Sequence, residues 1–436
     1  MTTDNEKQVT ADELQNQNIH RTVLDNGIVV LVAENPAADI IAARIFVGAG
    51  SYWESQEQAG LAHLLSAVLT KGTQKLSSLE IAERVESVGA SLGTDAATDY
   101  FLLSLKTVTS DFREILELAG QILRSPSFPE VEVELERRLA LQAIRSQQEQ
   151  PFTIAFDKLR QAMYQNHPYA MSGLGIEATV ATFSRADLQQ YHQTYFRPDN
   201  IVISIAGRVT PAAAVALVEQ VLGDWEAPAA PLPTLKLPTL AHQPGRTMTP
   251  QQTQQAIVML GYLAPSVRGT EYTALKLVST YLGNGLSSRL FVELREKRGL
   301  AYEVSAFYPT RQDVAPFVVY MGTAPENTAI ALAGLQTEVE LLCTSQISED
   351  ALQAAKNKLL GQYALGKQTN AQIAQIFGWY EIMGLGIAFD TQFQKAVADL
   401  TAPELQQAAY QYFLEPYVSV VGPESAVNSL VTPVSI

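Results

Sequence analysis

The sequence predicts an α+β fold of two homologous domains, each an antiparallel-rich mixed sheet with helices packed on one face. Three observations support this prediction: a chain of 436 residues, a proline-rich segment near its midpoint, and a helix-turn-strand segment that ends each half. A chain of this length exceeds one ordinary core and suggests two large domains. Hydrophobic residues make up 47% and charged residues 17%, which is typical of a globular protein with ample apolar surface to bury.

The proline-rich segment defines the expected domain boundary. Residues 226–245 read EAPAAPLPTLKLPTLAHQPG, and repeated proline blocks both helix and central strand while favouring an extended, stiff connection. We therefore expect a polar N-terminal extension over 1–19, a first domain over 20–225, a linker over 226–245 and a second domain over 246–436.

The two halves end in matching segments. Residues 188–207 read LQQYHQTYFRPDNIVISIAG and residues 405–422 read LQQAAYQYFLEPYVSVVG, with Leu188 and Phe196 separated from Leu405 and Phe413 by the same interval. Each segment begins as a helix ending in Tyr-Phe, turns through proline, and continues as a β-branched strand stopped by glycine. The halves are therefore predicted to be copies of one fold.

Hydrophobic periodicity places the remaining elements. Leu61, Leu64, Leu65, Val68 and Leu69 follow helical spacing, and the Asn-Gly dipeptide before residue 28 marks a hairpin turn. Strands are expected at 28–32, 40–47, 100–105, 256–262 and 317–321. Helices are expected at 61–69, 79–88, 112–123, 131–148, 272–282, 288–297, 348–363 and 371–384. Strict strand-helix-strand alternation is absent, which favours antiparallel pairing.

Charge and composition exclude several classes of partner. Lys and Arg total 30 against 45 for Asp and Glu, and the net charge of −15 would repel phosphates, so we expect no nucleic acid. The N-terminal stretch MTTDNEKQVTADELQNQN is polar and acidic, so we do not expect it to act as a secretion signal. No apolar run reaches the roughly 20 residues that span a bilayer. The single cysteine, Cys343, excludes an internal disulfide and fits a reducing compartment. We expect a cytoplasmic protein without membrane insertion.

One helical segment carries an incomplete metal motif. Residues 60–73 read GLAHLLSAVLTKGT, and this segment resembles the zinc helix of the pitrilysin and mitochondrial-processing-peptidase family. Catalytic members carry HxxEH there: two histidines on one helix face hold zinc, and the glutamate is the general base. The motif here reads HLLSA, so His63 keeps the first ligand position, Ser66 stands at the base and Ala67 at the second ligand. The family's third ligand, a glutamate within ExxxxxxEI, aligns with Ala143 when that pattern is set on Glu136 and Ile144.

One ligand of three is too few for tight zinc binding, so we predict no metal in this chain. The other histidines, His20, His167, His192 and His242, form no local ligand pair, although a site built from distant residues stays open. The segments NHPYAMSGLG (166–175) and RPDN (197–200) match the family's first-half ending. The segment GASLGTDAATDY (89–100) lacks the Asn-Ala pair usual in catalytic members.

A second segment keeps the family pattern. Residues 282–308 read LGNGLSSRLFVELREKRGLAYEVSAFY. In the family, an arginine and a tyrosine seven residues apart in this segment contact the substrate backbone, and Arg295 and Tyr302 fit that spacing. A guanidinium can donate to a peptide carbonyl and a tyrosine hydroxyl can stabilise an oxyanion. The resemblance also assigns substrate binding to Gly283, Gly285, Ser287 and Ser288. Alternatively, the arginine lies on a solvated helix face and the glycines serve only the turn.

The resemblance implies a non-catalytic, substrate-binding subunit of a heterodimeric zinc metallopeptidase. A homologous partner would carry the zinc, and short or unfolded peptides would bind as an added strand. One alternative is a structural scaffold subunit, like the core proteins of the respiratory cytochrome reductase. Another is a self-sufficient enzyme with relocated metal ligands, and a homodimer of this chain is a further option.

Overall fold

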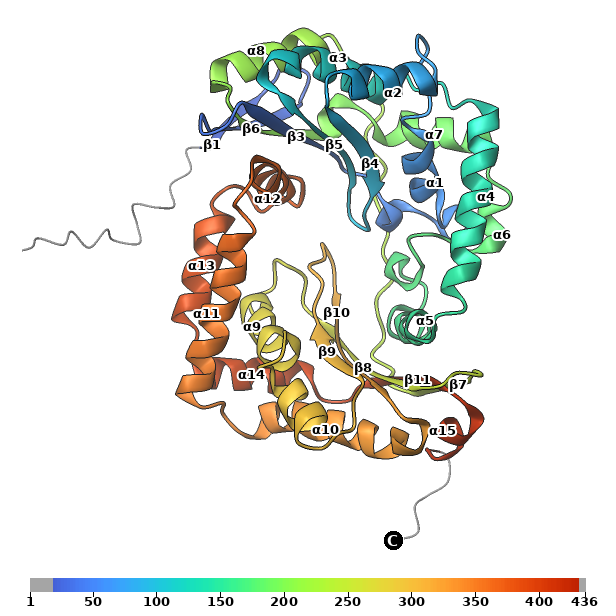
Figure 1. The fold of residues 1–436 in the computed structure, drawn as a ribbon, viewed down its shortest axis with the longest axis vertical. Helices are drawn as coiled ribbons and strands as arrows, with labels where there is room; N and C mark the ends of the chain where they lie inside the picture. The colour runs from blue at the N-terminus through green and yellow to red at the C-terminus, as the bar shows by residue number, and fades with distance from the viewer. Residues whose placement is uncertain (1–18, 431–436) are drawn as a thin grey trace, which may run out of the picture.

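The computed structural model describes residues 19–430 (Figure 1). The polar extension expected over 1–19 lies outside these residues except for Ile19, which begins a strand. Residues 226–245 form neither helix nor strand, as their prolines predict. No helix within residues 19–430 has the length and apolarity needed to cross a bilayer.

The first half contains a six-stranded sheet and its helices. The strands are β1 (Ile19–Val23), β2 (Val29–Glu34), β3 (Ile40–Val47), β4 (Ser91–Ala96), β5 (Phe101–Val108) and β6 (Ile201–Gly207). The helices are α1 (Leu61–Val68), α2 (Ser78–Ser87), α3 (Phe112–Arg124), α4 (Glu130–Gln147), α5 (Pro151–Tyr164), α6 (Glu177–Val180), α7 (Arg185–Tyr195) and α8 (Pro211–Leu222).

The second half contains a five-stranded sheet. Its strands are β7 (Arg246–Pro250), β8 (Ala256–Ala264), β9 (Glu303–Phe307), β10 (Ala315–Thr323) and β11 (Tyr417–Gly422). Its helices are α9 (Tyr272–Gly283), α10 (Thr328–Thr344), α11 (Glu349–Leu365), α12 (Asn370–Ile382), α13 (Phe389–Asp399), α14 (Ala402–Tyr412) and α15 (Glu424–Asn428).

The helix expected over 288–297 has a different backbone. It is a π-helix over Phe291–Glu296 (η7), in which the Lys297 N–H bonds to the Val292 carbonyl at 3.0 Å. Helix propensity does not distinguish this wider ladder from an ordinary α-helix, so the sequence did not specify it.

Strand order confirms the duplication. The first sheet runs β1-β2-β6-β3-β5-β4 and the second runs β7-β11-β8-β10-β9, so β2 to β6 of one correspond in order to β7 to β11 of the other. In the first sheet, β6 is parallel to β2 and antiparallel to β3. In the second sheet, β11 is likewise parallel to β7 and antiparallel to β8. All other pairs are antiparallel, as predicted. Strand β4 lies at one edge of the first sheet, and its counterpart β9 lies at one edge of the second.

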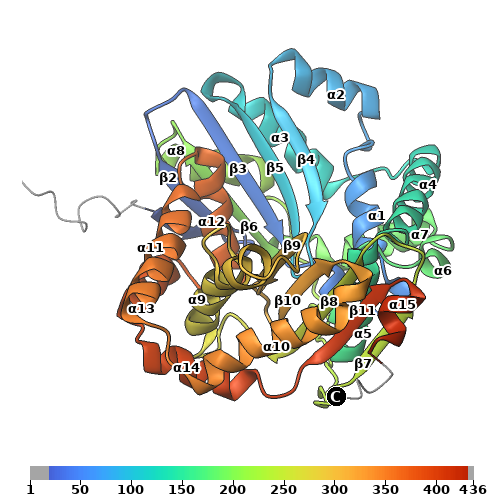
Figure 2. The ribbon, with the colours of Figure 1, turned by 60° about the horizontal axis from the view of Figure 1, so that its bottom comes forward.

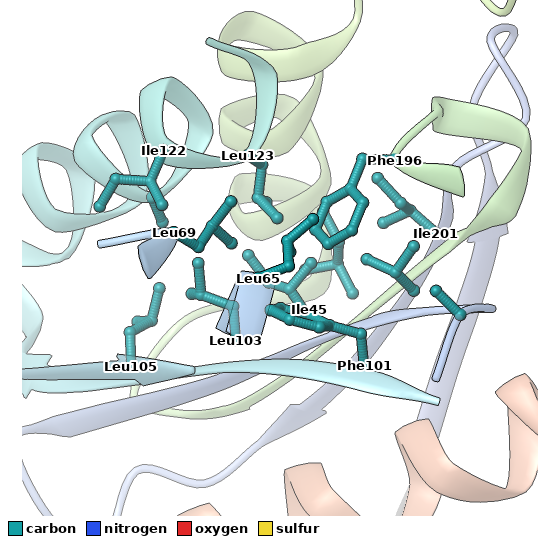
Figure 3. Packing of buried hydrophobic residues seen from close by; sticks show 14 of the residues in the cluster. Ile45, Leu65, Leu69, Phe101, Leu103, Leu105, Ile122, Leu123, Phe196 and Ile201 are labelled. Carbon is teal, nitrogen blue, oxygen red and sulfur yellow. The ribbon is translucent and has the colours of Figure 1, made fainter. Parts of the chain in front are cut away.

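One face of each sheet packs on helices from its own half. Alternate residues of β3, β5 and β6 point toward α1, α3 and α7, as their two-residue period requires. Figure 3 shows this core, in which Leu65 from α1 and Leu69, its C-cap residue, lie over Ile45, Phe101 and Leu103. The second half repeats the arrangement with α9, α10 and α14.

The opposite face of each sheet packs on a helix from the other half. Helix α12 lies on the first sheet, with Phe377 and Tyr380 against Phe46 and Leu31. Helix α5, which lies in the sequence range expected for the first domain, packs on β8 and β11 of the second sheet. Figures 1 and 2 show α12 leaving the second-half helices to reach β3 and β6. The halves therefore exchange one helix each, and the predicted single helical layer is joined by a second.

Close backbone approach accompanies both exchanged helices. A Cβ on Gly378 of α12 would lie 2.3 Å from Cε2 of Phe46, and a Cβ on Gly261 of β8 would lie 2.6 Å from the Met163 sulfur of α5. Each glycine therefore allows a contact that any larger residue would prevent.

Candidate functional site

A buried carboxylate anchors the N-terminus of α1, the helix that carries HLLSA. The Glu54 carboxylate accepts hydrogen bonds from the N–H groups of Gly60 (2.9 Å) and Ala62 (2.6 Å), donors that the helix leaves free. Burial raises the pKa of Glu54 to about 7 even though these bonds favour its charged form. Gly60 has φ +96°, and a Cβ there would meet the Leu174 carbonyl oxygen at 2.6 Å. The start of α1 is therefore fixed from both sides.

His63 on α1 is half-buried and lies near β4 and α4. Burial lowers the pKa of its imidazole, while the nearby negative charges of Asp95 on β4 and Glu136 on α4 oppose that effect. Glu136 is itself paired with Lys71 at 2.8 Å. The histidine therefore has acidic neighbours, but one of the two carboxylates already has a cationic partner.

The positions expected for the other zinc ligands do not suit a metal ion. The Ser66 hydroxyl donates to the carbonyl of His63 at 2.7 Å, so it bonds back into its own helix. Ala67 on α1 and Ala143 on α4 offer methyl groups only. Within residues 19–430, no three or more His, Cys, Asp and Glu side chains are grouped so that they could hold a metal ion. The residues around His63 thus do not fit a catalytic zinc.

The remaining histidines have separate surroundings. His192 is buried and bonds through Nε2 to the Leu123 carbonyl at 2.8 Å, and burial lowers its pKa to about 4. His20 Nε2 lies 3.0 Å from the Thr22 hydroxyl, and His242 packs edge-on against the Tyr417 ring.

His167 belongs to a polar cluster that joins the two halves. Its Nε2 lies 3.1 Å from Oδ2 of Asp313, and its Nδ1 accepts the Tyr169 N–H at 3.1 Å, which assigns the proton to Nε2. The Tyr169 hydroxyl donates to buried Asp99, whose other oxygen lies 3.9 Å from Arg311. The segment NHPYAMSGLG therefore connects the first half to residues 311–313 of the second.

The loop assigned to substrate binding has structural roles at its start. A Cβ on Gly283 would lie 1.9 Å from the Ala306 nitrogen, so glycine lets the end of α9 pack directly on β9. Gly285 has φ +81°, a conformation that favours glycine. Ser287 is exposed, whereas Ser288 is buried with no hydrogen-bond partner for its hydroxyl among the described residues. The assigned binding role of these four residues stays a prediction.

Arg295 and Tyr302 lie together. The Arg295 guanidinium donates through Nη1 to the Tyr302 carbonyl at 2.7 Å and lies 5.0 Å from the centre of the Phe291 ring. The Tyr302 N–H bonds to the Gly322 carbonyl at 2.9 Å, which fixes the backbone, while the residue is 61% exposed. The pair thus presents a guanidinium and a phenol at the surface, beside the edge strand β9.

Two charged residues, Glu54 before α1 and Lys276 on α9, were not singled out from the sequence. Glu54 could have been found as a carboxylate shortly before a helix start, where free N–H groups need an acceptor. Lys276 interrupts the apolar pattern of α9, which marks a cation held among hydrophobic neighbours. Neither signal alone specifies a function.

Fold and site together define a duplicated peptidase-like protein whose first-half zinc motif retains one ligand. Comparison with known proteins agrees. Residues 29–175 match the family model described as insulinase (peptidase family M16), and residues 182–359 match that of the peptidase M16 inactive domain. The chain belongs to peptidase family M16, as a pitrilysin-like member without the catalytic motif.

Its relatives match over nearly their full length. The uncharacterized zinc protease YmxG of Bacillus subtilis is 26% identical, over 94% of this chain and 100% of that protein. The uncharacterized zinc protease Rv2782c of Mycobacterium tuberculosis is 28% identical, over 94% of each chain.

Among solved structures, a peptidase M16 inactive domain from Pseudomonas fluorescens has a TM-score of 0.86 at 25% identity, covering 93% of this chain and 98% of that one. A protease from Helicobacter pylori has a TM-score of 0.87 at 21% identity, covering 93% and 99%, and this likeness shows the fold alone.

Proposed function

We propose that this chain is the non-catalytic, substrate-holding subunit of a two-chain zinc peptidase. The observation that carries the proposal is the contrast between the halves: zinc-ligand positions are lost in α1 and α4, whereas Arg295 and Tyr302 lie side by side and exposed. The relatives named as zinc proteases support a peptidase setting for the fold.

In this proposal the catalytic zinc belongs to a homologous partner. Arg295 would donate to a carbonyl of the bound peptide, and the Tyr302 hydroxyl would stabilise the oxyanion formed when water attacks. Neither contact requires a metal in the same chain. Because the Arg295 guanidinium already bonds the Tyr302 carbonyl, the two groups would act from a shared, preorganised position.

Free strand edges support binding of extended peptides. Strand β4 ends the first sheet and alternates exposed with half-buried residues, and β9 ends the second. An edge strand offers unpaired N–H and C=O groups on which an extended peptide can add. Short or unfolded peptides are the substrate class that this mode of binding accepts.

The test reconstitutes the full chain with an M16 partner that carries an intact HxxEH motif. We expect peptide cleavage by the mixture to exceed that of either chain alone. Tyr302→Phe should lower kcat by about 10²-fold, the usual loss for one oxyanion donor, and Arg295→Ala should lower kcat/KM.

Matched controls separate these effects from surface changes. Tyr410→Phe alters a tyrosine that is also 61% exposed, and Arg138→Ala removes another exposed arginine, so both should leave cleavage unchanged. Full cleavage by Tyr302→Phe and Arg295→Ala would refute their role. Assembly with an unrelated complex and no stimulation of a peptidase would favour the scaffold alternative, and stoichiometric zinc in the purified chain would favour the self-sufficient enzyme.

A further inference from the structure

Duplication gives this fold two equivalent sites. In the first half, α1 packs on the edge strand β4 and on α4, and this is the site of His63. In the second half, α9 packs in the same way on the edge strand β9 and on α11. Figure 1 shows both groups of elements, one in each half. The second group therefore forms the counterpart of the incomplete zinc site.

This second site contains a cavity of about 540 Å³. Its wall includes Lys276 and Thr280 from α9, Ser305 and Tyr308 from β9 and the chain after it, and Gln362 from α11. Among the lining residues, Lys276 alone carries a charge at neutral pH. The counterpart of a metal site is thus a polar cavity with a cation in its wall.

Within residues 19–430, no carboxylate pairs with Lys276. Its Nζ donates to the Tyr308 carbonyl at 2.6 Å and lies 5.8 Å and 5.5 Å from the ring centres of Tyr272 and Tyr308. Burial, together with the positive charge of Arg311, lowers its pKa to about 8. An ammonium has three N–H donors, so two remain for a ligand.

A second lysine lies at the glycine loop beside the cavity. Lys358 of α11 approaches Gly285, with Nζ 3.3 Å from where a Cβ on that glycine would stand. Burial lowers the pKa of Lys358 as well. Two cations gathered around one cavity are notable in a chain of net charge −15, where carboxylates are the more abundant partners.

We propose that the cavity between α9, β9 and α11 is a subsite that binds a carboxylate group of a peptide. Charge-assisted bonds from an ammonium to a carboxylate are short and strong, and the side-chain amide of Gln362 lies in the same wall. The peptide source of the carboxylate rests on the proposed function. The carboxylate comes from an acidic side chain or from the peptide C-terminus.

The test uses three dye-labelled alanine-glycine peptides of equal length, titrated into the full chain. One is blocked at both ends with a central glutamine, one is blocked with a central glutamate, and one has the glutamine with a free C-terminal carboxylate. We expect at least one acidic peptide to bind tenfold or more tightly than the neutral peptide, and the one that does identifies the source. Lys276→Met should reduce this preference to twofold or less.

Two further variants test whether the preference depends on the lysines at the cavity. Lys358→Gln, at a less buried position than Lys276, should reduce the preference in part. Lys395→Met, which removes an exposed lysine charge on α13, should preserve the preference. Binding of the neutral peptide reports on the proposed peptide-holding role, whereas the difference between acidic and neutral peptides reports on the cavity. Equal binding of all three peptides, or a preference that survives both Lys276→Met and Lys358→Gln, would overturn the inference.

A small-anion measurement decides the case even when no peptide binds. Acetate bound beside Lys276 favours its ammonium form and so slows acylation of the amine, which mass spectrometry of the labelled residue measures. We expect acetate to slow labelling of Lys276 at least threefold relative to chloride at the same ionic strength and pH. An unchanged rate would overturn the proposed subsite.

Discussion

Substitution of Gly378 tests whether the exchanged helix α12 holds the halves together. A Cβ at Gly378 would lie 2.3 Å and 2.8 Å from two ring carbons of Phe46 and 2.9 Å from the Ser204 Cβ. Phe46 is fully buried and packs edge-on against Tyr100, so its ring has little room to move. Overpacking costs about 1–3 kcal/mol, and the depth of this overlap favours the upper end. Alanine regains about 1 kcal/mol of helix propensity, which leaves a net loss of about 2 kcal/mol for Gly378→Ala.

Gly361→Ala is the matched control, because that glycine is exposed within α11 and a Cβ there meets nothing within 4 Å. This change should stabilise the chain by about 1 kcal/mol through propensity alone. Urea unfolding gives the two stabilities, and hydrogen exchange over residues 370–382 shows whether α12 loosens locally. If Gly378→Ala is as stable as Gly361→Ala and α12 stays protected, the packing argument is wrong.

Two further predictions concern the first half. Since the pKa of buried Glu54 is raised to about 7, the folded chain holds a proton that the unfolded chain has released. The free energy of unfolding should therefore fall by up to about 3 kcal/mol as pH rises from about 4.5 to 7. Glu54→Gln should flatten this dependence, which urea midpoints measured across that pH range will show. The double substitution A67H/A143E supplies both missing ligands beside His63. Metal analysis after dialysis should therefore find one zinc per chain in the variant and none in the unaltered chain. Equal metal contents would contradict the ligand assignment.

The sequence predicted the elements well where periodicity was strong. The strand at 40–47 and the helices at 112–123 and 131–148 match β3, α3 and α4 to within about two residues. The repeated end segments correctly indicated duplication, because a helix, a turn and a buried strand each leave a local signature. Strand β1 was not predicted, since its burial is slight and its pairing with β2 supplies most of its order.

Long-range packing was beyond the sequence. A helix was predicted at 371–384, where α12 lies, but none was predicted at α5, and periodicity cannot say which sheet a helix covers. The exchange between halves therefore went unpredicted. The spacing of Arg295 and Tyr302 was informative because both belong to one local segment. The cavity around Lys276 was not visible, since it is built from α9, β9 and α11, whose residues lie far apart in the chain.

The two equivalent sites differ in the sign of their charge. The first-half site surrounds His63 with the carboxylates of Asp95 and Glu136, a setting that suits a cation but lacks the ligands to hold one. The second-half site holds Lys276, which pairs with no carboxylate of residues 19–430, beside Lys358. Because a buried charge without a counter-charge is costly, a ligand of opposite charge would stabilise the Lys276 ammonium beyond its bond to the Tyr308 carbonyl. Arg295 and Tyr302 lie in the same half, so the groups proposed to bind a peptide gather in the half that does not contain the HLLSA helix.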